Sequence, residues 1–282
     1  MAFATPSVFT MAVLLVLPLG YTLVWSFQQV SYGTEGAWVG LSNYVQSLST
    51  PRFLSAISFT SAFTGAVTVL LVVIGYGLAL LLFAVNKHLR TVFLCLIMIS
   101  YVVPLVVGAL AFAWLFNNTY GGPLDGLLRA IGLNYYWLDS VWPARVLVVI
   151  ETVWSQAAFP ALVLLAGLNT VDSNQIEAAR LDGASWFQTQ RFVVIPHLRK
   201  LFALIILICV MDNLRVFDQI QMITPSAQNL GTESLMVYVY DVALGNSQQL
   251  GLASAISVMT MVITFIVLLP LLINTYRDLR SQ

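Results

Sequence analysis

Residues 57–84 read ISFTSAFTGAVTVLLVVIGYGLALLLFA, a run of 28 residues without a charged side chain. A membrane-spanning helix needs about 20 mostly apolar residues, so this run is long enough to cross a bilayer. Within hydrocarbon, each backbone N–H and C=O group needs a partner inside its own segment, which only a helix provides for a single run. The stretch therefore predicts a transmembrane α-helix.

Five further apolar stretches meet the same length criterion. They are roughly residues 6–29, 91–116, 144–168, 200–223 and 251–274. Ten-residue segments of alternating apolar and polar residues are absent from the sequence, which excludes a membrane β-barrel. The sequence predicts an all-α polytopic membrane protein with six transmembrane helices, in which residues 1–282 form a single transmembrane domain.

The composition supports this fold class. Hydrophobic residues make up 59% of the chain and charged residues only 9%, whereas soluble domains carry about 25% charged residues. The net charge is zero, so no basic field attracts nucleic acid. Cys95 and Cys209 lie inside apolar runs, and His88 and His197 lie beside basic residues, so we expect neither a disulfide nor a metal site.

The distribution of Lys and Arg predicts the orientation. If the spans alternate, eight basic residues fall on one side: Lys87, Arg90, Arg180, Arg191, Arg199, Lys200, Arg277 and Arg280. The opposite side holds Arg52, Arg129 and Arg145. Cytoplasmic loops carry the excess of basic residues, so the first side, which includes both termini, is predicted to be cytoplasmic.

One loop on the predicted cytoplasmic side is long and polar. Residues 169–199 read NTVDSNQIEAARLDGASWFQTQRFVVIPHLR. Asp172 and Ser173 can cap a helix over residues 175–181. Gly183 is expected to end that helix in the left-handed conformation, which glycine adopts without strain.

A second short helix is expected over residues 185–192, with Pro196 introducing the next span. Glu177 gives the loop a charge that can pair with a partner. The loop also carries four apolar residues able to contact a partner: Ile176, Leu181, Trp186 and Phe187. Two interpretations remain open at this point. The loop is either a rigid element that docks into a groove of a soluble partner or an interfacial segment that lies on lipid.

The loop resembles a known motif. Glu177-Ala178-Ala179, three residues, Gly183, nine residues, Val193, one residue and Ile195-Pro196 are similar to the EAA loop of bacterial ATP-binding-cassette importer permeases. EAARLDGAS with the following apolar–Pro–x–Leu ending resembles the carbohydrate-uptake subgroup of maltose, trehalose and glycerol-phosphate type. Further similar segments lie at residues 39–44, 114–117, 120–121, 217–218, 232–233 and 238–240. Lys200 and residues 224–227 depart from the pattern of the family.

The resemblance implies a type I importer permease in the bacterial inner membrane. Its partners would be a second similar permease, two copies of a cytoplasmic ATPase and an extracytoplasmic solute-binding protein. ATP and Mg²⁺ would be bound by the ATPase, and this chain would need no cofactor of its own. It contains no G-x-x-x-x-G-K-[ST] phosphate loop. The coupling residues would be Glu177, Ala178, Ala179, Asp182, Gly183, Ile195 and Pro196.

Polar residues inside spans are the candidates for the solute pathway. On a continuous helix, Asp212, Arg215 and Gln219 share one stripe. Glu151 and Trp154 lie in the fourth span, and Asn213 adjoins the stripe. These groups either bind a hydroxyl-rich solute or serve structure, with Asp212 and Arg215 neutralising one another. A guanidinium at Arg215 would suit an anionic solute, although the nearby acids argue against that.

Two further features concern helix geometry. Pro104 and Pro160 are expected to kink the third and fourth spans. The sequence Gly75-Tyr76-Gly77 lies within the second span and indicates close helix packing rather than a nucleotide site.

The sequence thus predicts the permease of an ATP-driven, binding-protein-dependent importer that moves a sugar or sugar-like solute by alternating access, and not an enzyme. The alternative is a stand-alone secondary transporter of a small polar solute, which usually contains internal repeats. Residues 1–140 and 141–282 show no such repeat. An intramembrane enzyme would need paired catalytic groups on one helix face. Whether the solute is a sugar, a polyol or a sugar phosphate stays open.

Overall fold

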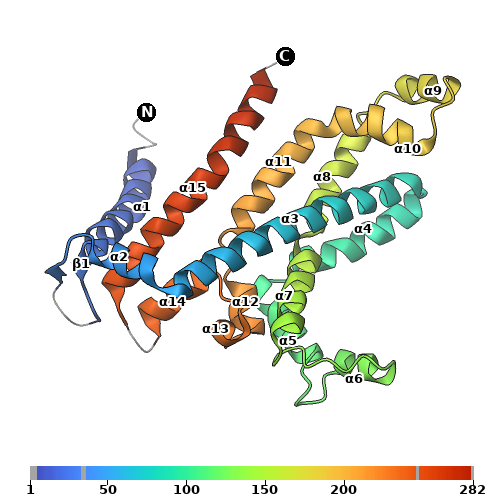
Figure 1. Cartoon of the computed structure of the whole chain (residues 1–282). Coiled ribbons are helices and arrows are strands. Elements are labelled where there is room, and N and C mark those ends of the chain that lie inside the picture. The colour runs from blue at the N-terminus through green and yellow to red at the C-terminus, as the bar shows by residue number, and fades with distance from the viewer. Residues whose placement is uncertain (1–4, 33–35, 246–247, 281–282) are drawn as a thin grey trace. The chain divides into compact units, whose positions relative to one another are not determined.

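The computed structural model describes residues 5–32, 36–245 and 248–280 (Figure 1). It divides into two compact units. Unit 1 is formed by the described residues of Met1–Thr60 and Glu233–Ile266, and unit 2 by those of Ser61–Thr232 and Val267–Gln282. The long helices α3 and α15 each begin in unit 1 and continue into unit 2. The single transmembrane domain stays a prediction.

Unit 1 joins the two ends of the sequence. Its elements are α1 (Thr5–Ser26), β1 (Gln28–Gln29), β2 (Ala37–Trp38), α2 (Ser42–Ser49), the start of α3 (Pro51–Ala84), α14 (Leu235–Leu244) and the first part of α15 (Leu250–Arg280). Strands β1 and β2 pair antiparallel, with Gln28 opposite Trp38. The core lies between α3, α14 and α15, where Phe53, Leu235 and Ile256 are almost fully buried.

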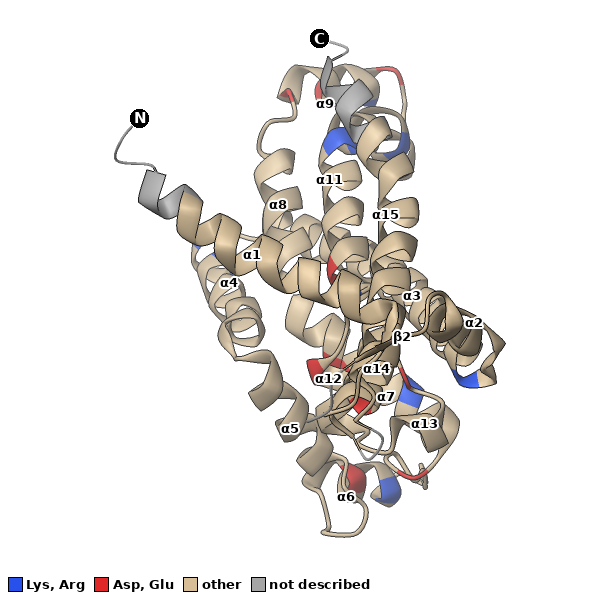
Figure 2. Cartoon of the chain, turned by 90° about the vertical axis from the view of Figure 1, so that its left-hand side faces the viewer, with Lys and Arg blue, Asp and Glu red and all other residues tan. Residues whose placement is uncertain are grey.

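Unit 2 contains most of the apolar helices. Its elements, besides the later parts of α3 and α15, are α4 (Lys87–Val102), α5 (Leu105–Leu115), α6 (Pro123–Ala130), α7 (Val141–Gln156), α8 (Ala158–Leu168), α9 (Ser173–Leu181), α10 (Trp186–Thr189), the π-helix η1 (Gln190–Val194), α11 (Ile195–Asn213), α12 (Asp218–Ile223) and α13 (Ala227–Leu230). Figure 2 shows charged residues around α6 and α9, whereas α8 has none. This pattern suits helices whose ends, and not their middles, meet water.

Each of the six predicted spans is mostly helical, although Gln28–Gln29 of the first form β1 and the fifth is broken after Asn213. Among the described residues, four helices are each long and apolar enough to cross a membrane: Phe9–Ser26, Pro51–Ala84, Trp186–Asn213 and Leu250–Ile273. Two bent pairs, α4 with α5 and α7 with α8, raise this number to six if each pair is one span. The prediction of an all-α polytopic protein is confirmed.

Both predicted proline kinks are confirmed. Helices α4 and α5 meet at 96°, and Pro104 is the residue that caps α5. Val103 is extended, as expected for a residue that precedes proline. Helices α7 and α8 meet at 43°, and Pro160 lies in the first turn of α8. Proline has no N–H to donate to the carbonyl of Gln156, and its ring crowds that carbonyl, so the helix bends there.

The predicted fifth span over residues 200–223 is wrong at both ends. Helix α11 ends at Asn213, and residues 218–223 form the separate helix α12. The side-chain amide of Asn213 donates to the carbonyl of Cys209 at 2.8 Å. The N–H of Leu214 still bonds four residues back, but those of Arg215 and Val216 bond only three residues back. Short polar side chains that bond to nearby backbone compete with the helix and favour its end.

The expected boundary at Pro196 is also wrong. Residues 186–213 form one helical run, in which η1 joins α10 to α11. The N–H of Ile195 reaches back five residues to the carbonyl of Gln190. A π-turn of this kind accommodates the missing N–H of Pro196 without ending the helix. The second docking helix therefore does not stop at Phe192 but passes directly into the span.

Candidate functional site

The loop helix α9 is built as its sequence predicts. The Asp172 carboxylate accepts a hydrogen bond from the N–H of Asn174 at 2.9 Å, which caps the helix. The helix begins at Ser173, two residues before the predicted start. Gly183 adopts a φ of +80°, so the predicted left-handed conformation is confirmed.

The following helix α10 is fixed at its first turn by a capping box. The N–H of Gln188 donates to the Ser185 hydroxyl at 3.3 Å, and the N–H of Ser185 donates to the Gln188 side chain at 2.7 Å. These paired bonds satisfy two of the N–H groups that a helix start leaves free. Together, the cap, the glycine and the capping box give the loop a defined turn between two helices.

The surface of this loop is open. No residue of α9 is buried, and the Glu177 side chain is exposed with neither an ion pair nor a hydrogen bond to the described residues. Leu181, Trp186 and Phe187 are 89%, 64% and 65% exposed. A charged group beside large exposed apolar side chains is typical of a surface that meets a partner.

The predicted coupling residues belong to two elements. Glu177, Ala178 and Ala179 lie on α9, with Asp182 and Gly183 at its C-terminal end. Ile195 and Pro196 begin α11, beyond α10 and η1. The spacing of the motif therefore corresponds to a helix, a turn and the entrance to a membrane helix.

The candidate pathway residues do not share one helix face. Since α11 ends at Asn213, the predicted stripe of Asp212, Arg215 and Gln219 is broken. Asp212 and Arg215 are exposed, while Gln219 is buried on α12. In the described part of the chain, the ion pairs join Arg52 to Glu233 and Asp241, and Arg129 to Asp125. Asp212 and Arg215 make no direct ion pair there, and the alternative that these two charges neutralise one another stays a prediction.

Glu151 and Asn213 carry acceptor atoms without donors. Glu151 is fully buried on α7, and neither of its carboxylate oxygens receives a hydrogen bond from a described residue. The neighbouring Thr152 hydroxyl donates to the carbonyl of Val148 at 2.8 Å instead. The side-chain oxygen of Asn213 is likewise buried without a donor. Buried polar groups normally have partners, so these atoms mark a place where donors are missing.

Residues of neighbouring helices lie close to Glu151 and Asn213. The Asn213 amide donates to the Gln156 side chain at 3.3 Å, which joins α11 to α7. A Cβ placed on Gly108 of α5 would lie 3.4 Å from both the Glu151 carboxylate and the Trp154 ring. Trp154 is 38% exposed, so it has a free surface near the buried acid. Neither Gly108 nor Gln156 is among the pathway residues that the sequence predicts.

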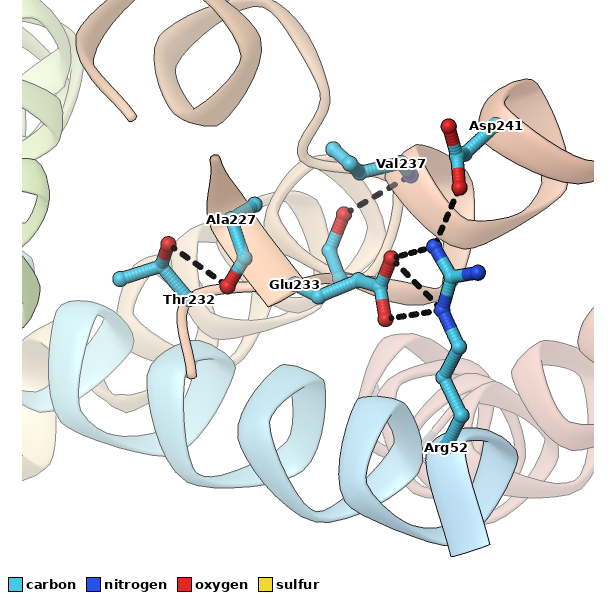
Figure 3. Close-up of polar contacts among 7 residues, drawn as sticks. Arg52, Ala227, Thr232, Glu233, Val237 and Asp241 are labelled. Atoms are coloured by element: carbon cyan, nitrogen blue, oxygen red, sulfur yellow. Dashed lines mark hydrogen bonds and ion pairs between the residues drawn. The ribbon is translucent and has the colours of Figure 1, made fainter. Parts of the chain in front are cut away.

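Sequence reasoning also missed a charge network in unit 1, which Figure 3 shows. The Arg52 guanidinium bonds both carboxylate oxygens of Glu233, with Nε 2.9 Å from Oε2, and reaches Asp241 at 2.5 Å. It also lies 4.7 Å from the centre of the Tyr238 ring. The segments that hold Glu233 and Tyr238 were noted for their resemblance, but nothing in the sequence indicated their partner on α3.

The described residues contain no group of three His, Cys, Asp or Glu side chains able to hold a metal ion. The described part of unit 2 offers an exposed loop surface on α9 and α10 and buried hydrogen-bond acceptors on α7 and α11. Such a combination suits the binding and movement of a solute.

The comparisons with known proteins agree on one family. The family model described as "Binding-protein-dependent transport system inner membrane component" matches residues 72–276. The trehalose/maltose transport system permease protein MalF of Thermococcus litoralis is 29% identical over 262 residues, which cover 92% of this chain and 87% of that protein. The inner membrane ABC transporter permease protein YcjO of Escherichia coli is 31% identical over 273 residues, covering 94% and 89%.

A solved structure shows the same fold. It is the crystal structure of a bacterial alginate ABC transporter in complex with an alginate pentasaccharide-bound periplasmic protein. The match has a TM-score of 0.85 at 20% identity and covers 99% of this chain and 94% of the other. The type I permease fold is thus confirmed. With its apolar helices, the chain is therefore a multi-pass member of the binding-protein-dependent transport system inner membrane component family.

Proposed function

We propose that this chain is the permease subunit of an ATP-driven importer of a sugar or sugar-like solute. The observation that carries the proposal is the match to the family over residues 72–276 together with the exposed loop helix α9. Relatives named for trehalose and maltose transport support a carbohydrate cargo. No bond of the solute is made or broken by this chain.

The proposed solute pathway runs past the acceptors of unit 2. A sugar presents hydroxyl groups that donate hydrogen bonds, and the Glu151 carboxylate and Asn213 oxygen lack donors. An aromatic face such as Trp154 suits the apolar side of a sugar ring. Asp212, Arg215 and Gln219 belong to the same proposed pathway, although Asp212 lies on α11, Gln219 on α12 and Arg215 in the connection between these helices. Because Glu151 is fully buried, contact with solute requires α5 or α7 to move.

The proposed coupling runs through the loop of residues 169–199. Glu177 would pair with a basic residue of an ATPase subunit, while Leu181, Trp186 and Phe187 fill the apolar part of its groove. The exposure of these side chains supports this use. ATP and Mg²⁺ would be bound by the ATPase, and closure of two ATPase copies would pull the loops and turn the solute cavity from one side to the other.

The remaining partners complete the proposed assembly. A second similar permease would supply the other half of the cavity, and an extracytoplasmic binding protein would deliver the solute. The complex of the structural neighbour with a periplasmic protein supports the latter. With the loop on the cytoplasmic side, both termini would be cytoplasmic, in agreement with the eight basic residues predicted there.

Affinity purification from the native membrane in mild detergent tests this assembly. Mass spectrometry of the tagged chain is expected to find an ATPase and a second permease, in a ratio of about two to one as the family resemblance implies. The variant Glu177→Ala is expected to lose the ATPase but keep the second permease, whereas Lys87→Ala, an exposed position outside the loop of residues 169–199, retains both. Recovery of the chain alone or as a homo-oligomer would contradict the proposal.

A further inference from the structure

The second span packs tightly against another helix at Gly75. A Cβ placed on Gly75 would lie 2.7 Å from the Cβ of Pro160, so α3 and α8 touch at this residue. The predicted close packing is confirmed here. It is wrong for Gly77, because a Cβ there would meet no atom within 4 Å. Tyr76 lies between these two glycines. It is therefore next in sequence to the residue at which α3 contacts α8.

Tyr76 places a hydroxyl group in the later part of the second span, where residues 69–84 are otherwise apolar. That hydroxyl donates a hydrogen bond to the side-chain oxygen of Gln190 at 2.6 Å. Its ring lies edge-on to Phe202 of α11, with 5.5 Å between the ring centres. A tyrosine hydroxyl in apolar surroundings needs a partner, and this one takes it from a different helix. Both contacts lie within unit 2.

Gln190 is the residue at which the loop becomes the membrane helix. It follows Thr189, the last residue of α10, and begins the π-helix η1. Its carbonyl accepts the i→i−5 bond from Ile195, while its side chain accepts the bond from Tyr76. The same residue thus holds the π-turn and ties it to α3. A π-turn is a weak point of a helix, so its geometry depends on such outside contacts.

We propose that Tyr76 is a positioning residue for energy coupling. Through Gln190, its hydroxyl holds the exit of the docking loop against α3, and Gly75 passes displacement of α3 to α8 at Pro160. Movement imposed on α9 and α10 then reaches two spans at once, instead of being absorbed by bending at η1. This inference rests on the proposed function, since it takes the loop of residues 169–199 to be the docking element.

The test uses the whole transporter in proteoliposomes with its ATPase, second permease and binding protein. Solute uptake and ATP hydrolysis are measured together, with radiolabelled trehalose as the probe. Tyr76→Phe keeps the ring but removes the hydroxyl. We expect it to lower the number of solute molecules moved per ATP by about five-fold, as for loss of one neutral hydrogen bond. ATPase binding, measured by co-purification, is expected to stay unchanged.

Matched variants separate positioning from simple packing. Gln190→Leu is expected to lower the ratio as much as Tyr76→Phe, and the double variant no further, because both remove the same bond. Gln190→Glu retains an acceptor and is expected to keep the wild-type ratio. Tyr21→Phe, on the exposed face of α1, serves as the control. If the transporter with Tyr76→Phe does not assemble, the inference is tested by the two Gln190 variants alone: Gln190→Leu is expected to lower the ratio and Gln190→Glu to keep it.

Two results would overturn the inference. One is an unchanged ratio of solute uptake to ATP hydrolysis in Tyr76→Phe and Gln190→Leu. A fall of both rates by the same factor leaves this ratio unchanged and therefore counts as this result. The other is a double variant whose ratio falls by the product of the two single effects. A wild-type transporter without ATP-dependent uptake contradicts the proposed function itself, so the two failures are distinguishable.

Discussion

The Arg52 network allows the effect of one substitution to be worked from the structure. Arg52→Ala removes three hydrogen bonds to the Glu233 carboxylate, which is only 7% exposed, and one contact to Asp241, which is 51% exposed. Loss of one partner from a fully buried ion pair costs about 3–5 kcal/mol. The exposed pair with Asp241 contributes little.

The guanidinium side chain is 23% exposed, so solvent screens part of this loss. We therefore expect Arg52→Ala to lower the free energy of unfolding by about 2 kcal/mol. This corresponds to a fall in Tm of about 4–8 °C by the scaling for folded domains of 150–250 residues. Thermal unfolding of the purified chain in detergent, followed by circular dichroism, measures it.

The double variant Arg52→Ala with Glu233→Gln sharpens the test. In Arg52→Ala alone, the charged Glu233 carboxylate is left buried without its partner, whereas the amide of Glu233→Gln carries no charge. The double variant is therefore expected to recover about half of the stability that Arg52→Ala loses. Arg199→Ala, an exposed arginine elsewhere, is expected to leave the Tm unchanged and serves as the control. A Tm for Arg52→Ala within 1 °C of wild type, or a double variant less stable than Arg52→Ala, would refute this reasoning.

Three further substitutions follow from the geometry. Gly183→Ala places a side chain at φ +80°, which costs roughly 1–2 kcal/mol locally. We expect less ATPase to co-purify with this variant, and full retention of the ATPase would show that the left-handed turn after α9 is not required for binding. Gly167→Ala would force a Cβ against Leu198 and Leu201. We expect about 1–3 kcal/mol of destabilisation by thermal unfolding, and an unchanged Tm would show that α8 and α11 can separate freely. Glu151→Gln removes a buried carboxyl without donors, so stability should hold or rise while solute uptake falls; undiminished uptake excludes the acid from the pathway.

Local sequence features predicted much of the fold. The spans follow from run length because lipid demands apolar side chains and internal backbone bonds. The cap at Asp172, the left-handed Gly183 and the bend at Pro104 each depend on one residue and its immediate neighbours. Such features can be predicted because their physical cause lies within the same segment.

The errors arose where distant residues decide the local structure. The sequence after Asn213 contains neither glycine nor proline before residue 218, yet the helix ends there. Asn213 bonds Gln156, which is 57 positions away, and no local pattern indicates that contact. The Arg52–Glu233 pair joins residues 181 positions apart. The broken pathway stripe follows from the end of α11 at Asn213, whose amide also bonds the carbonyl of Cys209 in the same helix.

Transport by the reconstituted complex tests the central claim most directly. The chain, the second permease and the ATPase are assembled in proteoliposomes, and radiolabelled trehalose or maltose is supplied with the binding protein. The account predicts uptake that requires both ATP and the binding protein and that is lost with Glu177→Ala. Uptake driven by an ion gradient without ATP, or uptake of the same rate without the ATPase, would contradict it.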